Sequence, residues 1–302
     1  MSEAVARKRR GRPIHGWLVI DKAAGMTSAR AVAQVLRITG AQKAGHGGTL
    51  DPMATGVLPV AMGEATKTVA NVVGSSKTYR FTVRWGEARD TDDADGAVIA
   101  TSDARPLADA IGAALGEFTG VIEQVPPVYA AIKVKGERAY ALARQGRPVA
   151  LPPREVVVER LELIDVPDAD HAAFEMRCGK GTYVRALARD LAVRLGTVGH
   201  VAALRRTEVG QFHESGAISL ENLEALMHSA ALDEQVRPVE TALADIPALA
   251  VTESQASRLK CGQAVHVLGS DPGIVCVTAH SRLVALAEVR GGKAHPLRVF
   301  NL

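Results

Sequence analysis

A glycine-rich segment holds one carboxylate in a setting suited to chemistry. Residues 44–52 read AGHGGTLDP, with three glycines in four positions. Glycines let the main chain approach another group closely and adopt positive φ. Pro52 restricts Asp51 to an extended or turn geometry, so this carboxylate lies fixed at the end of a pliant loop. A carboxylate so placed can act as a nucleophile, although an aspartate before proline is more often only a turn former.

A second segment, residues 178–185, reads CGKGTYVR and leads into an expected helix. Arg185 falls in the first helical turn, where the helix dipole disfavours a positive charge. Such a local conflict indicates a specific partner, for instance a buried carboxylate. Tyr79 lies on the apolar face of an expected strand, and by itself that pattern is more typical of a core tyrosine than of a catalytic one.

Several common kinds of site are absent from the sequence. It contains no GxxxxGK[ST], GxGxxG or GxSxG pattern, so it predicts no P-loop, Rossmann site or nucleophile elbow. Residues 91–96 resemble the start of an EF-hand, but Thr91 and Ser102 occupy the first and twelfth positions, which predicts a solvated acidic turn. No HxxxH or CxxC spacing occurs either. We therefore expect no metal ion and no cofactor.

Length, charge and hydropathy indicate the number of domains, the distribution of charge and the expected compartment. A chain of 302 residues predicts two domains, or one large domain with an appendage. The net charge of +3 is concentrated at the ends of the chain, since residues 1–12 and 251–302 are basic while the body is slightly acidic. A nucleic-acid surface would thus depend on charge placement. No apolar run reaches 18 residues and no signal peptide is visible, so we expect a cytoplasmic protein.

The elements that must position these residues are strands and helices in mixed order. Without a regular βαβ rhythm, this order predicts an α+β fold around a largely antiparallel sheet. The strand at 77–85 should carry a basic outer face, and 41–56 should form a polar loop. Four short strands after residue 247 predict a small β-rich appendage. The expected strands are 17–20, 57–62, 77–85, 128–134, 155–166, 172–178, 264–268, 274–278, 283–289 and 297–300, and the expected helices are 28–40 (capped by Ser28), 107–118, 183–195 and 220–236.

Taken in chain order, these segments resemble the TruB-type tRNA pseudouridine synthases. The resemblance covers residues 14–245, and six or more ordered motifs make it specific. One departure is Ala23, where the family usually has proline. The matching motifs are residues 21–28 (DKAAGMTS), 45–59, 63–67 (GEATK), 77–79 (KTY), 92–96, 178–185 and 200–206.

The resemblance implies a pseudouridine synthase fold, in which helices flank a mixed, largely antiparallel sheet. It also implies a short PUA-like C-terminal domain. We expect a disordered basic tail at 1–13, a catalytic domain at 14–245 and the PUA-like domain at 246–302.

The implied reaction isomerises the uridine at position 55 in the T-loop of tRNA. The C1′–N1 bond breaks, the base turns and a C1′–C5 bond forms, so nothing is added and no cofactor is needed. The expected partner is tRNA, through its T-loop and T-stem. We expect no membrane association, no obligate protein partner and a monomer.

The resemblance assigns Asp51 as the nucleophile and leaves open whether it attacks C1′, attacks C6 or removes a ribose proton. Arg185 would stand beside Asp51 and lower the pKa that burial raises. Tyr79 would stack on the base. The flipped base and the RNA would also be contacted by His46, as a wedge in the T-loop, and by Lys22, Lys67, Lys180, Tyr183 and Leu204.

Three alternatives remain at this stage. An RNA-binding or tRNA-folding module would need a basic surface and His46, but it would have no use for the set of Asp51, Tyr79 and Arg185. A guide-dependent, dyskerin-type synthase normally carries a larger C-terminal domain. A hydrolase with Asp51 as nucleophile would lack a second acid–base carboxylate.

Overall fold

The computed structural model describes residues 11–302 except 131, 135, 146, 148–149 and 270. Most of the expected tail, residues 1–10, therefore lies outside the described residues. Arg12, which we had placed in that tail, donates its backbone N–H to the Gly40 carbonyl at 2.7 Å. Its guanidinium also bonds Asp233 at 3.0 Å, so the chain is held against the body from this residue onward.

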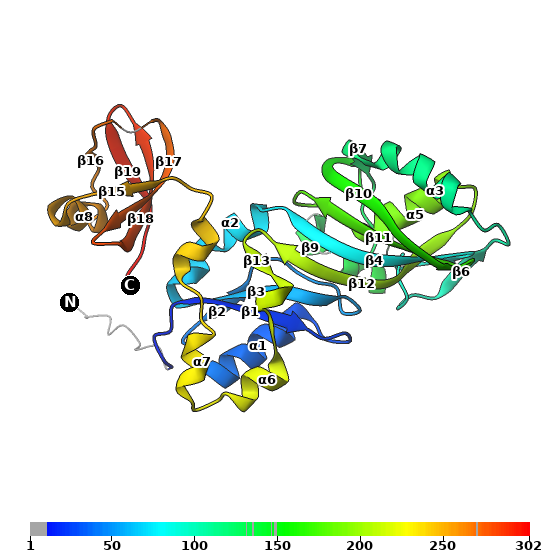
Figure 1. Ribbon diagram of the computed structural model, residues 1–302, viewed down its shortest axis with the longest axis horizontal. Coiled ribbons are helices and arrows are strands. Elements are labelled where there is room, and N and C mark those ends of the chain that lie inside the picture. Colours follow the sequence, from blue (N-terminus) through cyan, green and yellow to red (C-terminus); the bar gives the residue numbers. More distant parts are fainter. Residues whose placement is uncertain (1–10, 131, 135, 146, 148–149, 270) are drawn as a thin grey trace.

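A ten-stranded mixed sheet forms the centre of the molecule (Figure 1). Its main path runs β14-β1-β3-β12-β4-β11-β10-β7, with β2 paired to β3 and β13 to β12. Only the β1–β14 and β3–β12 pairs are parallel. The expected α+β fold with a largely antiparallel sheet is confirmed. The strands are β1 Gly16–Lys22, β2 Ala44–His46, β3 Thr55–Met62, β4 Lys77–Trp85, β7 Gly120–Gln124, β10 Arg154–Asp168, β11 His171–Cys178, β12 Gly199–Val209, β13 Phe212–His213 and β14 Ile218–Ser219.

One face of the sheet is covered by helices, and the main core lies between the two layers. Side chains alternate along β1, so Leu18 and Ile20 face this core while Trp17 and Val19 face a second core on the other side. A strand buried on both faces reads as a continuous apolar run, which is the pattern that predicted β1. The covering helices are α1 Ser28–Thr39, α3 Ala108–Ala114, α5 Val184–Arg194, α6 Leu220–Ala225 and α7 Ala230–Glu234.

The opposite face is covered only in part. Around Trp17 it packs against α2 (Val69–Gly74), the 3₁₀ helix η4 (Val239–Leu243) and the C-terminal domain. Along β4 the side chain of Arg80 is 58% exposed and that of Arg84 is 39% exposed. Both arginines thus lie on the outer face as expected, but each is ion-paired with a glutamate, Arg80 with Glu175 and Arg84 with Glu87, so their charges are balanced there.

The C-terminal part is a five-stranded sheet in the order β15-β17-β18-β19-β16, accompanied by helix α8 (Glu253–Lys260). This confirms the expected β-rich appendage, although α8 was not expected. Phe300 is fully buried and joins the core around Trp17 and Phe212, which ties the two parts together. The strands are β15 Ala248–Ala250, β16 Val265–His266, β17 Gly273–Ala279, β18 Arg282–Arg290 and β19 Lys293–Val299.

Several expected elements differ in the structure. The helix expected at 220–236 is two helices, because His228 adopts a φ of 72° between them. The strand expected at 128–134 is reduced to a short hairpin, and strands β2, β7 and β12 were missed. Thr27, not Ser28, caps α1 by accepting a bond from the Arg30 N–H. The remaining elements are β5 Glu87–Arg89, β6 Val98–Thr101, β8 Lys133–Val134, β9 Glu137–Arg138, α4 Ala139–Arg144, η1 Gly63–Thr68, η2 Leu115–Phe118 and η3 Glu214–Gly216.

Among the described residues, no helix is both long and apolar enough to cross a membrane.

Candidate active site

The loop that carries Asp51 connects β2 to β3 and is fixed on both sides of the carboxylate. Before it, the Ser28 hydroxyl bonds both the N–H and the carbonyl of Leu50, at 2.8 and 3.1 Å. After it, the Lys22 ammonium donates to the Pro52 carbonyl at 3.2 Å. The beginning of α1 and the end of β1 therefore hold the position of Asp51.

Arg206 of β12 supports the same loop from the sheet side. Its guanidinium donates to the carbonyls of Gly48 at 3.0 Å, Thr49 at 3.3 Å and Val57 at 2.9 Å, and the residue is 1% exposed. Gly56 has a φ of 97°, and a Cβ there would lie 2.2 Å from the Arg206 carbonyl oxygen. At Gly56, the absence of a side chain allows the backbones of β3 and β12 to lie close together.

Arg185 joins two carboxylates at the centre of the site. It is the second residue of α5 and is 3% exposed. Its Nε lies 2.9 Å from Asp51 Oδ2 and 3.4 Å from Asp93 Oδ2. Its other nitrogens donate to the carbonyls of Thr91 at 2.8 Å and Tyr129 at 3.1 Å. The buried carboxylate partner expected for Arg185 is therefore present.

Burial raises the pKa of Asp51, and Arg185 opposes that rise by favouring the ionised form. The nearby carboxylate of Asp93 adds to the rise. The net direction is upward, so this carboxylate takes up a proton more readily than an ordinary aspartate. A group poised in this way is typical of a site that does chemistry.

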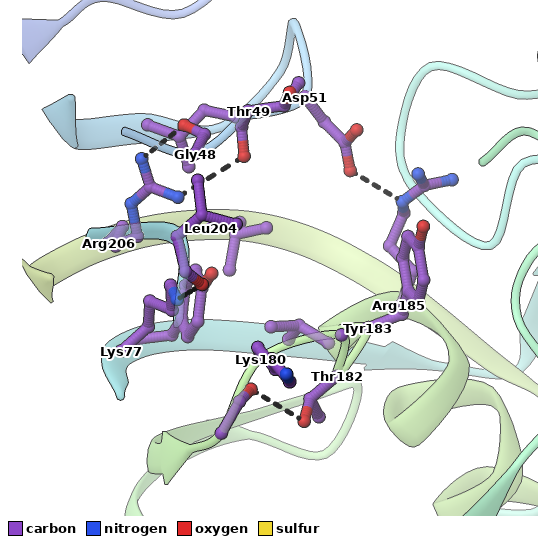
Figure 2. Close-up of a pocket in the computed structure, with 16 residues that line it drawn as sticks. Gly48, Thr49, Asp51, Lys77, Lys180, Thr182, Tyr183, Arg185, Leu204 and Arg206 are labelled. Atoms are coloured by element: carbon purple, nitrogen blue, oxygen red, sulfur yellow. Dashed lines mark hydrogen bonds and ion pairs between the residues drawn. The ribbon is translucent and has the colours of Figure 1, made fainter. Parts of the chain in front are cut away.

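Two cavities meet at Asp51, which lines both together with Arg185. The first has a volume of about 300 Å³ and lies among β4, β12 and the loop before α5 (Figure 2). The second has a volume of about 460 Å³ and is lined by His46, Tyr129 and Asp95 among others. Each is large enough for a small-molecule group such as a nucleoside unit.

The first cavity has an aromatic and aliphatic lining with a charged rim. Burial raises the pKa of Tyr79, so its hydroxyl stays protonated at neutral pH. Burial also lowers the pKa of Lys77 to about 8. The Lys77 ammonium donates to the Val73 carbonyl at 2.7 Å and to that of Ser75, which closes the C-terminal end of α2. Lys180 is exposed at the rim.

The structure brings most of the expected site residues together. The first cavity is lined by Asp51, Tyr79, Lys180, Tyr183, Arg185 and Leu204. His46 lines the second, where burial and the Arg206 charge lower its pKa and favour the neutral ring.

Two expected contacts need correction. Lys22 is fully buried beneath the loop, with its ammonium bonded to the carbonyls of Ala23, Met26 and Pro52, so it is not available to a phosphate. Lys67 lines neither cavity. Its ammonium bonds Glu64 at 2.6 Å and the Val299 carbonyl at 2.7 Å, against the C-terminal domain.

Sequence reasoning missed Asp93, Arg206, Lys77 and the supporting role of Ser28. We interpreted the turn around Asp93 as solvated, yet the residue is only 5% exposed and its carboxylate accepts a bond from the Asp95 N–H at 3.1 Å. The sequence carried no clear signal for Arg206, because the carbonyls that it binds belong to residues far away in the sequence. No group of three or more metal-binding side chains occurs among the described residues.

Comparisons with known proteins agree with this geometry. Residues 36–184 match the family model for the TruB family pseudouridylate synthase N-terminal domain. Residues 185–244 match the tRNA pseudouridylate synthase B C-terminal domain, and residues 246–301 match the tRNA pseudouridine synthase II C-terminal model. The three models together cover most of the chain.

Relatives named tRNA pseudouridine synthase B are similar over nearly the whole length. The protein of Bradyrhizobium diazoefficiens is 58% identical, over 98% of this chain and 88% of its own. That of Caulobacter vibrioides is 52% identical, over 99% of this chain and 100% of its own.

Solved structures show the same fold. A Cbf5–Nop10–Gar1 complex matches with a TM-score of 0.73 and 25% identity, over 95% of this chain and 84% of that one. An H/ACA RNP bound to a substrate RNA containing 2′-deoxyuridine matches with a TM-score of 0.75 and 24% identity, over 100% and 93%.

Proposed function

The chain belongs to the TruB family of pseudouridylate synthases, and from this we infer that it isomerises uridine to pseudouridine in tRNA. The curated relatives that are 51–58% identical carry the name of that activity. The observation that carries the assignment is Asp51, ion-paired to a buried arginine where two cavities meet.

The target that we propose is the uridine at position 55 in the T-loop, as the resemblance of the motifs implies. A base inside a folded loop must be flipped out before it can react, at a cost of a few kcal/mol. The two cavities support this reading, because the first can enclose the flipped base and the second can take neighbouring nucleotides beside His46. The His46 imidazole is an aromatic ring on which an unstacked base can stack.

Asp51 is proposed as the nucleophile of the reaction. The C1′–N1 bond breaks, the base turns within the cavity and a C1′–C5 bond forms. The C5 proton passes to water and N1 takes up a proton, so the product is an isomer of the substrate. Tyr79 and Leu204 bound the space in which the base turns, and Arg185 holds Asp51 and favours its ionised form. Apart from protons exchanged with water, each step uses only groups of this chain and of the uridine.

We further propose that the chain works on tRNA as a monomer in the cytoplasm, without an obligate protein partner. We also propose the domain division expected from the sequence, with a catalytic part at 14–245 and a PUA-like part at 246–302. The family models support this division, since one match ends at residue 244 and the next begins at residue 246.

The alternatives are not favoured. A pure RNA-binding module would have no use for a carboxylate joined to a buried guanidinium at a cavity junction. The likeness to the Cbf5–Nop10–Gar1 complex and to the H/ACA RNP is a likeness of fold at 24–25% identity, well below the 58% identity to a relative named tRNA pseudouridine synthase B.

Tritium release from tRNA labelled at uridine C5 tests the function. The unmodified chain should release tritium, and Asp51→Asn, which keeps size and hydrogen bonding but loses the charge, should release less than about one thousandth as much. A tRNA with cytidine at position 55 is the substrate control. Equal release by both proteins would remove Asp51 from the mechanism, and release without uridine 55 would refute the proposed target.

A further inference from the structure

The first-cavity loop, residues 179–183, rests on a glutamine that the reaction itself does not use. The Gln124 side-chain oxygen accepts a bond from the Tyr183 N–H at 2.8 Å, and its nitrogen donates to the Tyr183 carbonyl at 3.1 Å. Gln124 is the last residue of β7 and is 1% exposed. The Gln124 side-chain amide therefore forms hydrogen bonds with both the N–H and the carbonyl of Tyr183.

Tyr183 is the residue from which α5 begins. It occupies the N-cap position of that helix, with no side-chain cap bond of its own, and Arg185 follows two residues later. An orphan N–H at a helix start needs a partner when it is buried. Here the partner is supplied from another strand, so the place where α5 starts is set by Gln124.

Arg154 holds the same loop from the neighbouring strand. It faces Gln124 in the β7–β10 ladder. Its guanidinium donates to the Gly181 carbonyl at 2.6 Å and lies 5.0 Å from the centre of the Tyr183 ring. A guanidinium over an aromatic face is attracted to the ring and restricts its orientation.

The chain after Gln124 also follows α5. Arg189 donates to the Val125 carbonyl at 2.8 Å, and Arg185 donates to that of Tyr129 at 3.1 Å. The segment 124–129 thus contacts the first half of α5, from Tyr183 at its N-cap to Arg189 in its middle, through backbone carbonyls and the Gln124 amide.

We propose that the cross-strand pair Gln124 and Arg154 is the positioning element of the site: it fixes Tyr183 and the start of α5, and thereby places Arg185 against Asp51. Neither residue is among the side chains that line the two cavities, so both act through others. This inference rests on the proposed function, because its consequence is the geometry of the proposed catalytic carboxylate.

The first test is Gln124→Met, which keeps the length of the side chain and removes both bonds. We expect the single-turnover rate of pseudouridine formation to fall about 10- to 100-fold, because small displacements in a preorganised site have effects of that size. The Kd for tRNA should change by less than about threefold, since the variant alters alignment more than binding. Glu123→Gln, on the same strand and exposed, is the matched control and should behave like the unmodified chain.

Arg154→Gln is the second variant, and it leaves the buried amide in place should Gln124→Met fail to fold. We expect a smaller loss of rate, again with tRNA affinity preserved. Because both residues hold one loop, the double variant should lose less than the product of the two single losses.

Amide hydrogen exchange gives a readout that does not depend on activity. Peptides covering residues 180–187 should exchange faster in Gln124→Met than in the unmodified chain, whereas peptides of β1 should not change. The proposal would be overturned if a folded Gln124→Met kept both the single-turnover rate and the hydrogen exchange of the unmodified chain. It would also be overturned if the variant lost only tRNA affinity. Inactivity of the unmodified chain would refute the proposed function instead, while the exchange result would still decide the role of Gln124.

Discussion

At the scale of single residues, the site depends on one guanidinium shared by two carboxylates. Arg185 is 3% exposed, so its charge is stable there only because Asp51, Asp93 and two carbonyls surround it. The two acids differ in exposure, since the Asp93 side chain is 7% exposed and that of Asp51 is 34% exposed. This difference leaves Asp51 open to a substrate while Asp93 anchors the arginine.

The raised pKa of Asp51 predicts the acid side of the pH–rate profile. In the proposed reaction the ionised form of Asp51 is the nucleophile, so the rate should fall as pH drops through a pKa that lies above that of an ordinary aspartate. Asp93→Asn removes a neighbouring negative charge and should shift this fall to lower pH. Single-turnover rates across pH measure the shift, with Asp103→Asn, at an exposed residue that lines neither cavity, as an isosteric control. An unmoved profile in Asp93→Asn would contradict the electrostatic coupling.

Sequence analysis identified the proposed catalytic residues better than the residues that support them. Local signals, a proline after Asp51 and the unfavourable helix position of Arg185, marked these two residues as unusual, and the family resemblance assigned their roles. Lys22 and Lys67 carry the positive charge that a residue contacting phosphate needs. Only the tertiary structure shows that their ammonium groups are already bonded, that of Lys22 to backbone carbonyls and that of Lys67 to Glu64. The sequence analysis missed Asp93 because the burial of a turn depends on the residues that pack over it.

At the scale of elements, strands β3 and β12 bring the loop of Asp51 against Arg206, and Gly56 permits their contact. Gly56→Ala would force a Cβ to within 2.2 Å of a backbone oxygen at a φ of 97°. We expect a loss of at least about 2 kcal/mol in the free energy of unfolding. Gly45→Ala, with no atom within 4 Å of the added Cβ, should change it by less than about 0.5 kcal/mol. Urea unfolding of both variants checks this, and equal stabilities would show that β3 can move away.

Local patterns predicted long regular elements and failed where the tertiary structure interrupts them. Strand β4 follows its alternation over the whole expected range, 77–85. The apolar spacing of 220–236 suits one helix, yet the chain breaks it at His228 so that Leu223 and Leu232 both reach the main core. Strand β12 was missed because its buried stretch includes Arg206 and Thr207, whose polar groups are satisfied only by partners distant in the sequence.

At the scale of the whole molecule, the C-terminal domain is fastened to the sheet through its last residues. Phe300 enters the core around Trp17, and the Asn301 N–H donates to Glu64 at 2.9 Å. Glu64 also binds Lys67, so the motif at 63–67 serves as an anchor for this domain. The orientation of the C-terminal domain toward a bound tRNA is thereby linked to the body of the synthase.

Lys180 and Lys67 were both expected to contact RNA, but the structure gives them different surroundings. Lys180 is exposed at the rim of the first cavity, whereas the Lys67 ammonium is occupied by Glu64 and the Val299 carbonyl. Removing a true phosphate contact lowers the slope of log affinity against log salt concentration by about 1. We therefore expect Lys180→Met to reduce the slope of tRNA binding by about that amount and Lys67→Met to leave it unchanged. Titrations of tRNA binding at several salt concentrations measure the slope for each variant. If Lys67→Met lowered the slope as much as Lys180→Met, Lys67 would be a phosphate contact after all.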